Sequence, residues 1–134
     1  MTSDSPSPRT AVDRKRVLVV DDEPEFLRAL ALRLKSAGYD VLSACDGVQA
    51  THMAVAEQPD VIVLDVGLPG GDGHTVAGRL RANMKTLNMP VIFLTARAGV
   101  MDKKKALAVG AAGYITKPYQ PEELLQMLDK VLHA

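Results

Sequence analysis

The sequence predicts an α/β protein: a single (βα)5 domain with a doubly wound, parallel, five-stranded sheet. Short apolar runs rich in valine, isoleucine and leucine alternate along the chain with segments whose apolar residues recur at helical spacing. Continuous rather than alternating apolar runs are typical of strands that helices cover on both faces, as in a parallel sheet. Because strand and helix alternate throughout, the connections are crossovers that place helices on both faces of the sheet.

Length and charge limit the class of protein. A chain of 134 residues has room for one domain with a real hydrophobic core. Its formal net charge of zero provides no general attraction to nucleic acid or to an anionic membrane. No run approaches the ~20 apolar residues of a membrane span, and the N-terminus lacks the apolar core of a secretory signal. We therefore expect a cytoplasmic protein that binds neither nucleic acid nor membrane directly.

The first elements follow a polar N-terminal segment. Residues 1–13 are rich in serine and proline without apolar periodicity, which predicts a disordered tail before a domain over 14–134. The first strand is expected over 17–20, and Pro24 suits the first turn of the helix that follows. Gly38 should end this helix. Its buried face has apolar residues at i, i+3, i+4 and i+7, namely Leu27, Leu30, Ala31 and Leu34.

The middle of the chain predicts two further strand and helix pairs. A weak alternating strand over 40–44 precedes a modest helix over 48–57. The third strand, over 61–64, consists of four apolar residues and leads through a glycine-rich loop to a helix over 75–84. This helix should direct Val76 and its neighbour one turn later, Leu80, toward the core.

The last two pairs complete the sheet. A fourth strand over 91–94 leads to a helix over 102–109, and a fifth strand is expected over 113–116. Pro121 opens the final helix. The leucines expected to face the core from that helix are Leu124, Leu125, Leu128 and Leu132.

Polar residues stand where four of the five predicted strands end. Asp21 and Asp22 follow the first strand, Asp65 the third, Thr95 the fourth and Lys117 the fifth. The carboxyl ends of parallel strands meet at one edge of a sheet, where ligands bind at the switch in strand order. The sequence therefore predicts that these residues form one site.

The residue types in this site indicate phosphoryl transfer to an aspartate. Crowded carboxylates repel one another unless a hard divalent cation such as Mg2+ neutralises them. A lysine ammonium and a threonine hydroxyl supply a cation and a donor to an oxyanion. Carboxylate nucleophile, metal, lysine and hydroxyl together suit chemistry that depends on positioning and charge neutralisation. Each residue alone has an ordinary structural explanation, but their joint occurrence at aligned strand ends favours a site.

The chain resembles a receiver domain of the two-component response regulators, the CheY-like superfamily. The resemblance covers about residues 16–132, and it implies a flavodoxin-like sheet of strand order 2-1-3-4-5 in a receiver domain over 14–134. The segments that carry it are Val19-Val20-Asp21-Asp22-Glu23, Asp65-Val66-Gly67-Leu68-Pro69, Asp72-Gly73, Thr95-Ala96, Gly110-Ala111 and Tyr114-Ile115-Thr116-Lys117-Pro118.

The resemblance implies that the protein is a phosphorylation-activated switch. Asp65 would accept a phosphoryl group from the phosphohistidine of a sensor histidine kinase or a phosphotransfer protein. Mg2+ or Mn2+ would be bound by Asp22, Asp65 and the backbone carbonyl of Gly67, with Asp21 acting mainly through water. The protein would catalyse only its own phosphoryl acceptance and hydrolysis, so it is not expected to be an enzyme in the usual sense.

The resemblance also implies how the signal leaves the site. Thr95 and Lys117 would hold phosphoryl oxygens, and Thr95 would move toward the phosphoryl group while Tyr114 turns inward behind it. This change would repack the face formed by the fourth helix, fifth strand and last helix, where a downstream protein effector docks. The Lys117-Pro118 bond is a candidate for a cis peptide, which proline permits.

Several residues depart from the family pattern. Gly67 replaces a bulkier side chain and would leave the phosphoryl group more open to water. Arg97 occupies another position that tunes dephosphorylation, and Tyr119 stands where phenylalanine is usual. Gly113 is expected to loosen the segment around the fifth strand.

Other conspicuous side chains are predicted to have ordinary structural roles. Cys45, the only cysteine, is expected to be a small buried side chain. His52, His74 and His133 lack metal-ligand spacing and are expected at the surface. Asp72, followed by glycine, is expected to make a turn and cap a helix.

Three other functions are less consistent with the sequence. An aspartyl phosphohydrolase would place a second acid two residues after the first, where this chain has Gly67. A flavodoxin-like cofactor binder requires a hydroxyl- and glycine-rich loop after the first strand, where this chain has acids. An unphosphorylated scaffold would lack an acid, the threonine or the lysine, and all are present. Because the last helix ends near residue 134, we expect either a stand-alone regulator or a receiver whose output domain belongs to a longer protein.

Overall fold

The computed structural model describes residues 14–68, 72–96 and 100–133, and this part of the chain forms five strands and five helices. The predictions for residues 1–13 and for Arg97 lie outside the described residues. The strands are β1 (Arg16–Val20), β2 (Asp40–Ala44), β3 (Val61–Leu64), β4 (Val91–Thr95) and β5 (Gly113–Thr116). The helices are α1 (Pro24–Ser36), α2 (Gly47–Glu57), α3 (Gly73–Arg81), α4 (Val100–Ala108) and α5 (Pro121–His133).

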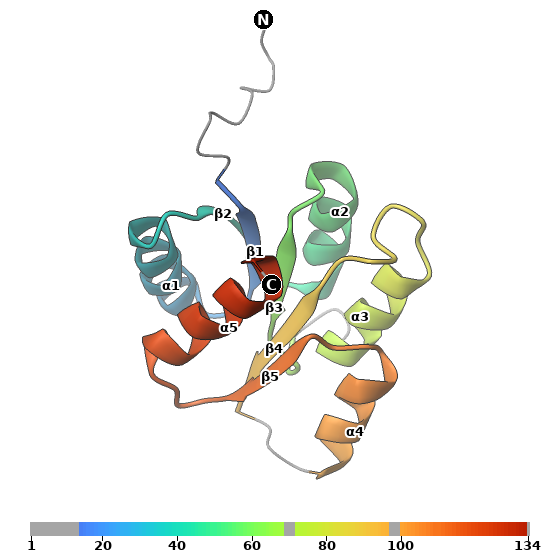
Figure 1. Ribbon diagram of the computed structural model, residues 1–134. Coiled ribbons are helices and arrows are strands. Elements are labelled where there is room, and N and C mark those ends of the chain that lie inside the picture. The colour runs from blue at the N-terminus through green and yellow to red at the C-terminus, as the bar shows by residue number, and fades with distance from the viewer. Residues whose placement is uncertain (1–13, 69–71, 97–99, 134) are drawn as a thin grey trace, which may run out of the picture.

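The five strands form one parallel sheet in the order β2-β1-β3-β4-β5, which confirms the predicted fold class and strand order. Figure 1 shows α1 and α5 on one face of this sheet and α2, α3 and α4 on the other. The chain reverses its direction of winding between β1 and β3. Residues that follow these two strands are therefore placed at the switch point, where doubly wound sheets bind ligands.

The sheet separates two hydrophobic clusters. Alternate residues of each strand face opposite sides, so Leu18 and Val20 join α2 and α3 while Val17 and Val19 pack against α1 and α5. All residues of β3 and β4 are buried. Burial on both faces explains why these strands are continuous apolar runs in the sequence.

Helix α1 forms as the sequence predicts. It begins at Pro24 and buries Leu27, Leu30 and Leu34, while Ala31 is only partly buried. The chain leaves the helix through Gly38, whose φ is +99°. A left-handed backbone of this kind favours glycine. Among the described residues, no helix has the length and apolar character required to cross a bilayer.

Helix α3 ends earlier than expected. The predicted helix continued to residue 84, but α3 ends at Arg81 and turns follow. The Thr86 hydroxyl is 2.7 Å from the carbonyl oxygen of Leu80, and the amide of Lys85 is 2.8 Å from Oδ1 of Asn83. These local bonds offer the backbone an alternative to another helical turn, which accounts for the early end.

One further prediction is corrected by the packing, and a second is placed in its structural setting. Cys45 is exposed rather than buried, with its Sγ 3.3 Å from Oε1 of Gln49. Gly113 lies within β5, where an added Cβ would collide with the Met127 sulfur of α5. The absent side chain therefore leaves room for Met127, and the expected loosening of the segment around the fifth strand stays a prediction.

Candidate functional site

Three carboxylates meet at the carboxyl ends of β1 and β3. Asp21 is buried, Asp65 is partly buried and Asp22 is exposed, and each offers an oxygen within 4.8 Å of the others. The backbone amide of Asp65 donates to the Val20 carbonyl at 3.1 Å, and that of Asp21 donates to the Ala44 carbonyl at 3.2 Å. The sheet itself therefore holds the backbone of both residues in place.

The Lys117 ammonium lies between two of these carboxylates. Its Nζ is 2.7 Å from Oδ2 of Asp21 and 3.7 Å from Oδ2 of Asp65. The other Asp21 oxygen accepts from the amide of Glu23 at 3.0 Å, and Oδ1 of Asp65 accepts from the amide of Gly67 at 3.0 Å. Charge-assisted hydrogen bonds of this kind compensate the buried carboxylate and fix both side chains.

Thr95 and Lys117 reach the same edge of the sheet from β4 and β5. Thr95 is buried and is paired with Thr116 in the parallel ladder. The backbone amide of Lys117 donates to the Thr95 carbonyl at 2.7 Å. The peptide bond between Lys117 and Pro118 is cis, as proposed from the sequence.

Tyr114 and His74 belong to a group of rings beneath this edge. The Tyr114 ring centroid is 6.2 Å from that of Phe93, which is 5.1 Å from that of His74. His74 is not a surface residue: both of its ring nitrogens are inaccessible to solvent and have no hydrogen-bond partner in the described structure. His74 is the second residue of α3, and this helix packs in the same apolar cluster as Phe93 of β4. The His74 ring therefore contacts the Phe93 ring. His52 and His133 are exposed, as expected.

The N-terminus of α3 lies directly behind Asp65. Oδ1 of Asp72 accepts from the amide of Thr75 at 2.9 Å, which confirms its predicted role as a helix cap. That hydrogen bond lowers the pKa of Asp72 below its ordinary value of 3.8. An added Cβ on Gly73 would lie 2.5 Å from the Asp65 carbonyl oxygen, so this close approach requires glycine.

Gly67 leaves space beside the Asp65 side chain. Gly67 is exposed, and an added Cβ there would lie 3.9 Å from Oδ1 of Asp65, which is an ordinary contact distance. A larger side chain could therefore stand beside this carboxylate without displacing the backbone.

Phe26 is a contact of the site that sequence reasoning missed. Its ring centroid is 4.2 Å from Nζ of Lys117, and the Tyr119 ring meets it edge-on at 6.4 Å with an interplanar angle of 73°. Phe26 precedes Leu30 by four residues and is partly buried beside the same apolar cluster. Helical periodicity therefore places Phe26 beside the buried face of α1, but its contact with Lys117 depends on how α1 packs on the sheet. Burial, and next the charge of Asp21, raise the pKa of the Tyr119 phenol above its ordinary 10.0.

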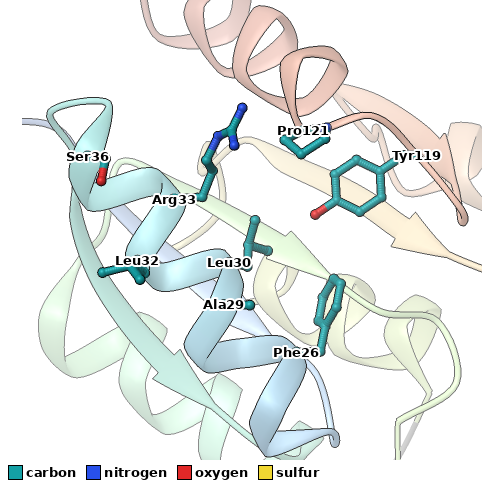
Figure 2. A pocket seen from close by; sticks show the side chains of 8 residues that line it. All are labelled: Phe26, Ala29, Leu30, Leu32, Arg33, Ser36, Tyr119 and Pro121. Carbon is teal, nitrogen blue, oxygen red and sulfur yellow. The ribbon is translucent and has the colours of Figure 1, made fainter.

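Phe26 and Tyr119 also stand at one end of a groove between α1 and the start of α5 (Figure 2). The groove has a volume of about 460 Å³. An ion pair crosses from one helix to the other, with Nη2 of Arg33 2.6 Å from Oε2 of Glu122. The Phe26 and Tyr119 side chains therefore line this groove as well as standing beside Lys117.

The site fits a hard divalent cation. Carboxylate oxygens are the ligands that Mg2+ prefers, and the Asp21, Asp22 and Asp65 oxygens lie close enough together for one ion to bind all three. The arrangement defines a class: a doubly wound α/β protein with an acidic, lysine-bearing site at its topological switch point.

A family comparison identifies the chain within this class. The family model described as the response regulator receiver domain matches residues 17–129. The chain therefore belongs to the response regulator receiver domain family, as the sequence resemblance indicated.

Curated relatives extend beyond this chain. The DNA-binding dual master transcriptional regulator RpaA of Synechocystis is 42% identical over 117 residues, which are 87% of this chain and 48% of RpaA. The transcriptional regulatory protein KdpE of Mycobacterium tuberculosis is 46% identical over 112 residues, which are 84% of this chain and 48% of KdpE. The chain thus spans about half the length of the curated relatives it matches. These relatives are named as regulators rather than enzymes.

Solved structures share the fold over their whole length. The chemotaxis response regulator CheY4 of Vibrio cholerae has a TM-score of 0.83 and 34% identity, covering 89% of this chain and 99% of CheY4. The receiver domain of sensor histidine kinase PA1611 from Pseudomonas aeruginosa has a TM-score of 0.83 and 31% identity, and the match covers 90% of this chain and 99% of that receiver domain. That structure is described as holding a magnesium ion in its active-site cleft.

Proposed function

We propose that this chain is a phosphorylation-activated switch of a two-component or phosphorelay system, with Asp65 as the phosphoacceptor. The observation that carries the proposal is the site at the ends of β1, β3 and β5. Three carboxylates lie within 4.8 Å of one another there, and the Lys117 ammonium contacts two of them. Such charge pairing prepares a site for an incoming anion, because phosphoryl transfer depends chiefly on positioning and neutralisation.

Asp65 is the carboxylate best suited to accept the phosphoryl group. It is partly buried, unlike the buried Asp21, and its backbone is fixed by β3 and by the N-terminus of α3. In the proposed step, an Asp65 carboxylate oxygen forms a bond to phosphorus as the phosphorus–nitrogen bond of a phosphohistidine breaks. The histidine would belong to a sensor kinase or a phosphotransfer protein, and its imidazole leaves with the electron pair.

The other residues at this edge have supporting roles in the proposal. Lys117 would neutralise a phosphoryl oxygen, and the buried Thr95 hydroxyl would donate to another. Asp21, Asp22, Asp65 and the Gly67 carbonyl would hold Mg2+ or Mn2+, which would supply positive charge toward phosphoryl oxygens when bound. The magnesium ion described for the PA1611 receiver domain supports this assignment.

The signal would pass through Thr95 and Tyr114 to the face formed by α4, β5 and α5. Tyr114 is partly buried against Phe93, its register partner on β4, and Thr95 lies two residues after Phe93 on that strand. A downstream protein effector, or an output domain in a longer protein, would then distinguish two packings of this face. We assign residues 14–134 to the receiver domain, with residues 1–13 as a tail, in a cytoplasmic protein that catalyses only its own phosphoryl acceptance and hydrolysis.

The proposal is tested by intact mass after incubation with Mg2+ and phosphoramidate, a small phosphoryl donor. Wild type should gain one phosphoryl group, and Asp65→Asn, which keeps the shape of the side chain, should gain none. Removing Mg2+ with a chelator should prevent the gain. Beryllofluoride binding checks for an adduct too short-lived to observe. If the protein neither gains a phosphoryl group nor binds beryllofluoride, it is a receiver-fold scaffold, and the proposal is wrong.

A further inference from the structure

We propose that Phe26 is a positioning residue, whose aromatic face holds the Lys117 ammonium beside Asp65. The geometry is a cation over a ring, with Nζ 4.2 Å from the ring centroid. Its consequence for phosphoryl acceptance rests on the proposed function, but the contact itself does not.

Among the described residues, the ammonium contacts two carboxylates and one aromatic ring. Asp21 is 2.7 Å away, Asp65 is 3.7 Å away, and Phe26 faces the ammonium as a neutral ring. The Lys117 side chain is only 19% exposed. Cation–π attraction is weak at exposed sites and strengthens as the cation loses water, so partial burial makes this contact significant.

The ring attracts the ammonium without neutralising it. An additional carboxylate would cancel the charge, whereas an aromatic face has no net charge, and the ammonium has three N–H donors to share among its neighbours. Lys117 therefore keeps donors and positive charge for an anion at Asp65. The ring restricts where the ammonium can lie, and restricting a catalytic group before reaction raises the rate.

The Phe26 ring is itself held in orientation. Tyr119 meets it in the T-shaped geometry that aromatic pairs favour. Figure 2 shows Phe26 rising from α1 and Tyr119 descending from the segment before α5, side by side at the end of the groove. The Arg33–Glu122 ion pair, at 2.6 Å, links α1, which carries Phe26, to α5, which begins two residues after Tyr119.

The competing explanation is that Phe26 contributes only apolar packing to the cluster on this face of the sheet. Packing depends on the volume of the ring, whereas cation–π attraction depends on the electron density of its face. A series of fluorinated phenylalanines at position 26 separates the two, because fluorine withdraws electron density while changing the volume little.

The first measurement is the NMR spectrum of the unphosphorylated, metal-free protein. The Lys117 ε-methylene protons should show an upfield ring-current shift in wild type that disappears in Phe26→Leu. The second measurement is the rate of phosphoryl acceptance from phosphoramidate with Mg2+. It should fall stepwise with fluorination and by about 3- to 30-fold in Phe26→Leu, and Phe26→Trp should retain it.

Leu32→Ala is the matched control. Leu32 lies on the same helix and lines the same groove, and it is 69% exposed. Its variant should leave both readouts unchanged. A rate that does not vary across the fluorine series, or Lys117 protons without a ring-current shift in wild type, would overturn the proposal. If wild type accepts no phosphoryl group, the proposed function fails, and the ring-current shift, measured across the fluorine series, still decides whether the electron density of the Phe26 ring holds Lys117 in place.

Discussion

At the scale of single residues, the site and its surroundings differ in how well polar groups are paired. Asp21 is buried, but both of its oxygens accept hydrogen bonds, from Glu23 and Lys117. His74 is the opposite case, since neither ring nitrogen has a hydrogen-bond partner in the described structure. Unpaired buried polar groups cost stability, whereas paired ones do not.

This contrast predicts that His74→Leu stabilises the protein. Leucine fills a similar apolar volume beside Phe93 and removes two unpaired nitrogens, so the free energy of unfolding should rise by about 1–3 kcal/mol. Urea unfolding measures the change. His52→Leu, at an exposed position of α2, is the control and should change stability by less than about 0.5 kcal/mol. A less stable His74→Leu protein would show that the imidazole has a favourable interaction.

At the scale of elements, the start of α3 determines how closely this helix approaches Asp65. The amide of Gly73 donates to the Val66 carbonyl at 2.8 Å, and Asp72 caps the first turn. The helix therefore begins immediately behind the acidic cluster, and small changes there should reach the site.

Gly73→Ala should be strongly unfavourable. Its Cβ would lie 2.5 Å from the Asp65 carbonyl oxygen and 2.9 Å from Cα of Val66, both backbone atoms. Overpacking of this kind costs about 1–3 kcal/mol, and it should also slow phosphoryl acceptance by displacing Asp65. Gly78→Ala in the same helix is the matched control, because nothing lies within 4 Å of its added Cβ. That variant should be more stable by roughly 0.5–1 kcal/mol, and equal stability of the two variants would contradict the packing argument.

The Asp72 cap predicts a pH dependence. The pKa of Asp72 is lowered in the folded protein, chiefly by the Thr75 amide. Its ionised form therefore stabilises the fold above the ordinary value of 3.8, and this contribution is lost as the pH falls through the lower folded value. Asp72→Ala should cost about 0.5–2 kcal/mol at neutral pH.

Urea unfolding of wild type and Asp72→Ala over a series of pH values tests this prediction. The difference in the free energy of unfolding between the two proteins should become smaller as the pH is lowered past 3.8. Asp72→Asn keeps a cap acceptor and should lose less stability than Asp72→Ala at neutral pH. If this difference in the free energy of unfolding is the same at neutral and acid pH, the charge of Asp72 does not contribute to stability.

At the scale of the whole molecule, the sequence predicted the sheet and the placement of the site, because both follow from parallel topology. Buried strands such as β3 are continuous apolar runs, and residues that follow them collect at one edge. The Phe26 contact and the burial of His74 were missed because they depend on how helices pack on the sheet. The early end of α3 was missed because it depends on local side-chain bonds.

The central claim is that Asp65 accepts a phosphoryl group and that the change reaches Tyr114. The most direct test is the amide NMR spectrum of the protein with Mg2+, before and after beryllofluoride, which mimics a phosphoryl group on a carboxylate. We predict shifts at Asp65, Thr95 and Lys117 that extend to Tyr114 and the rest of β5, and no shifts in Asp65→Asn. An unchanged wild-type spectrum would contradict phosphoryl acceptance, and shifts confined to Asp65 and its neighbours would contradict the switch.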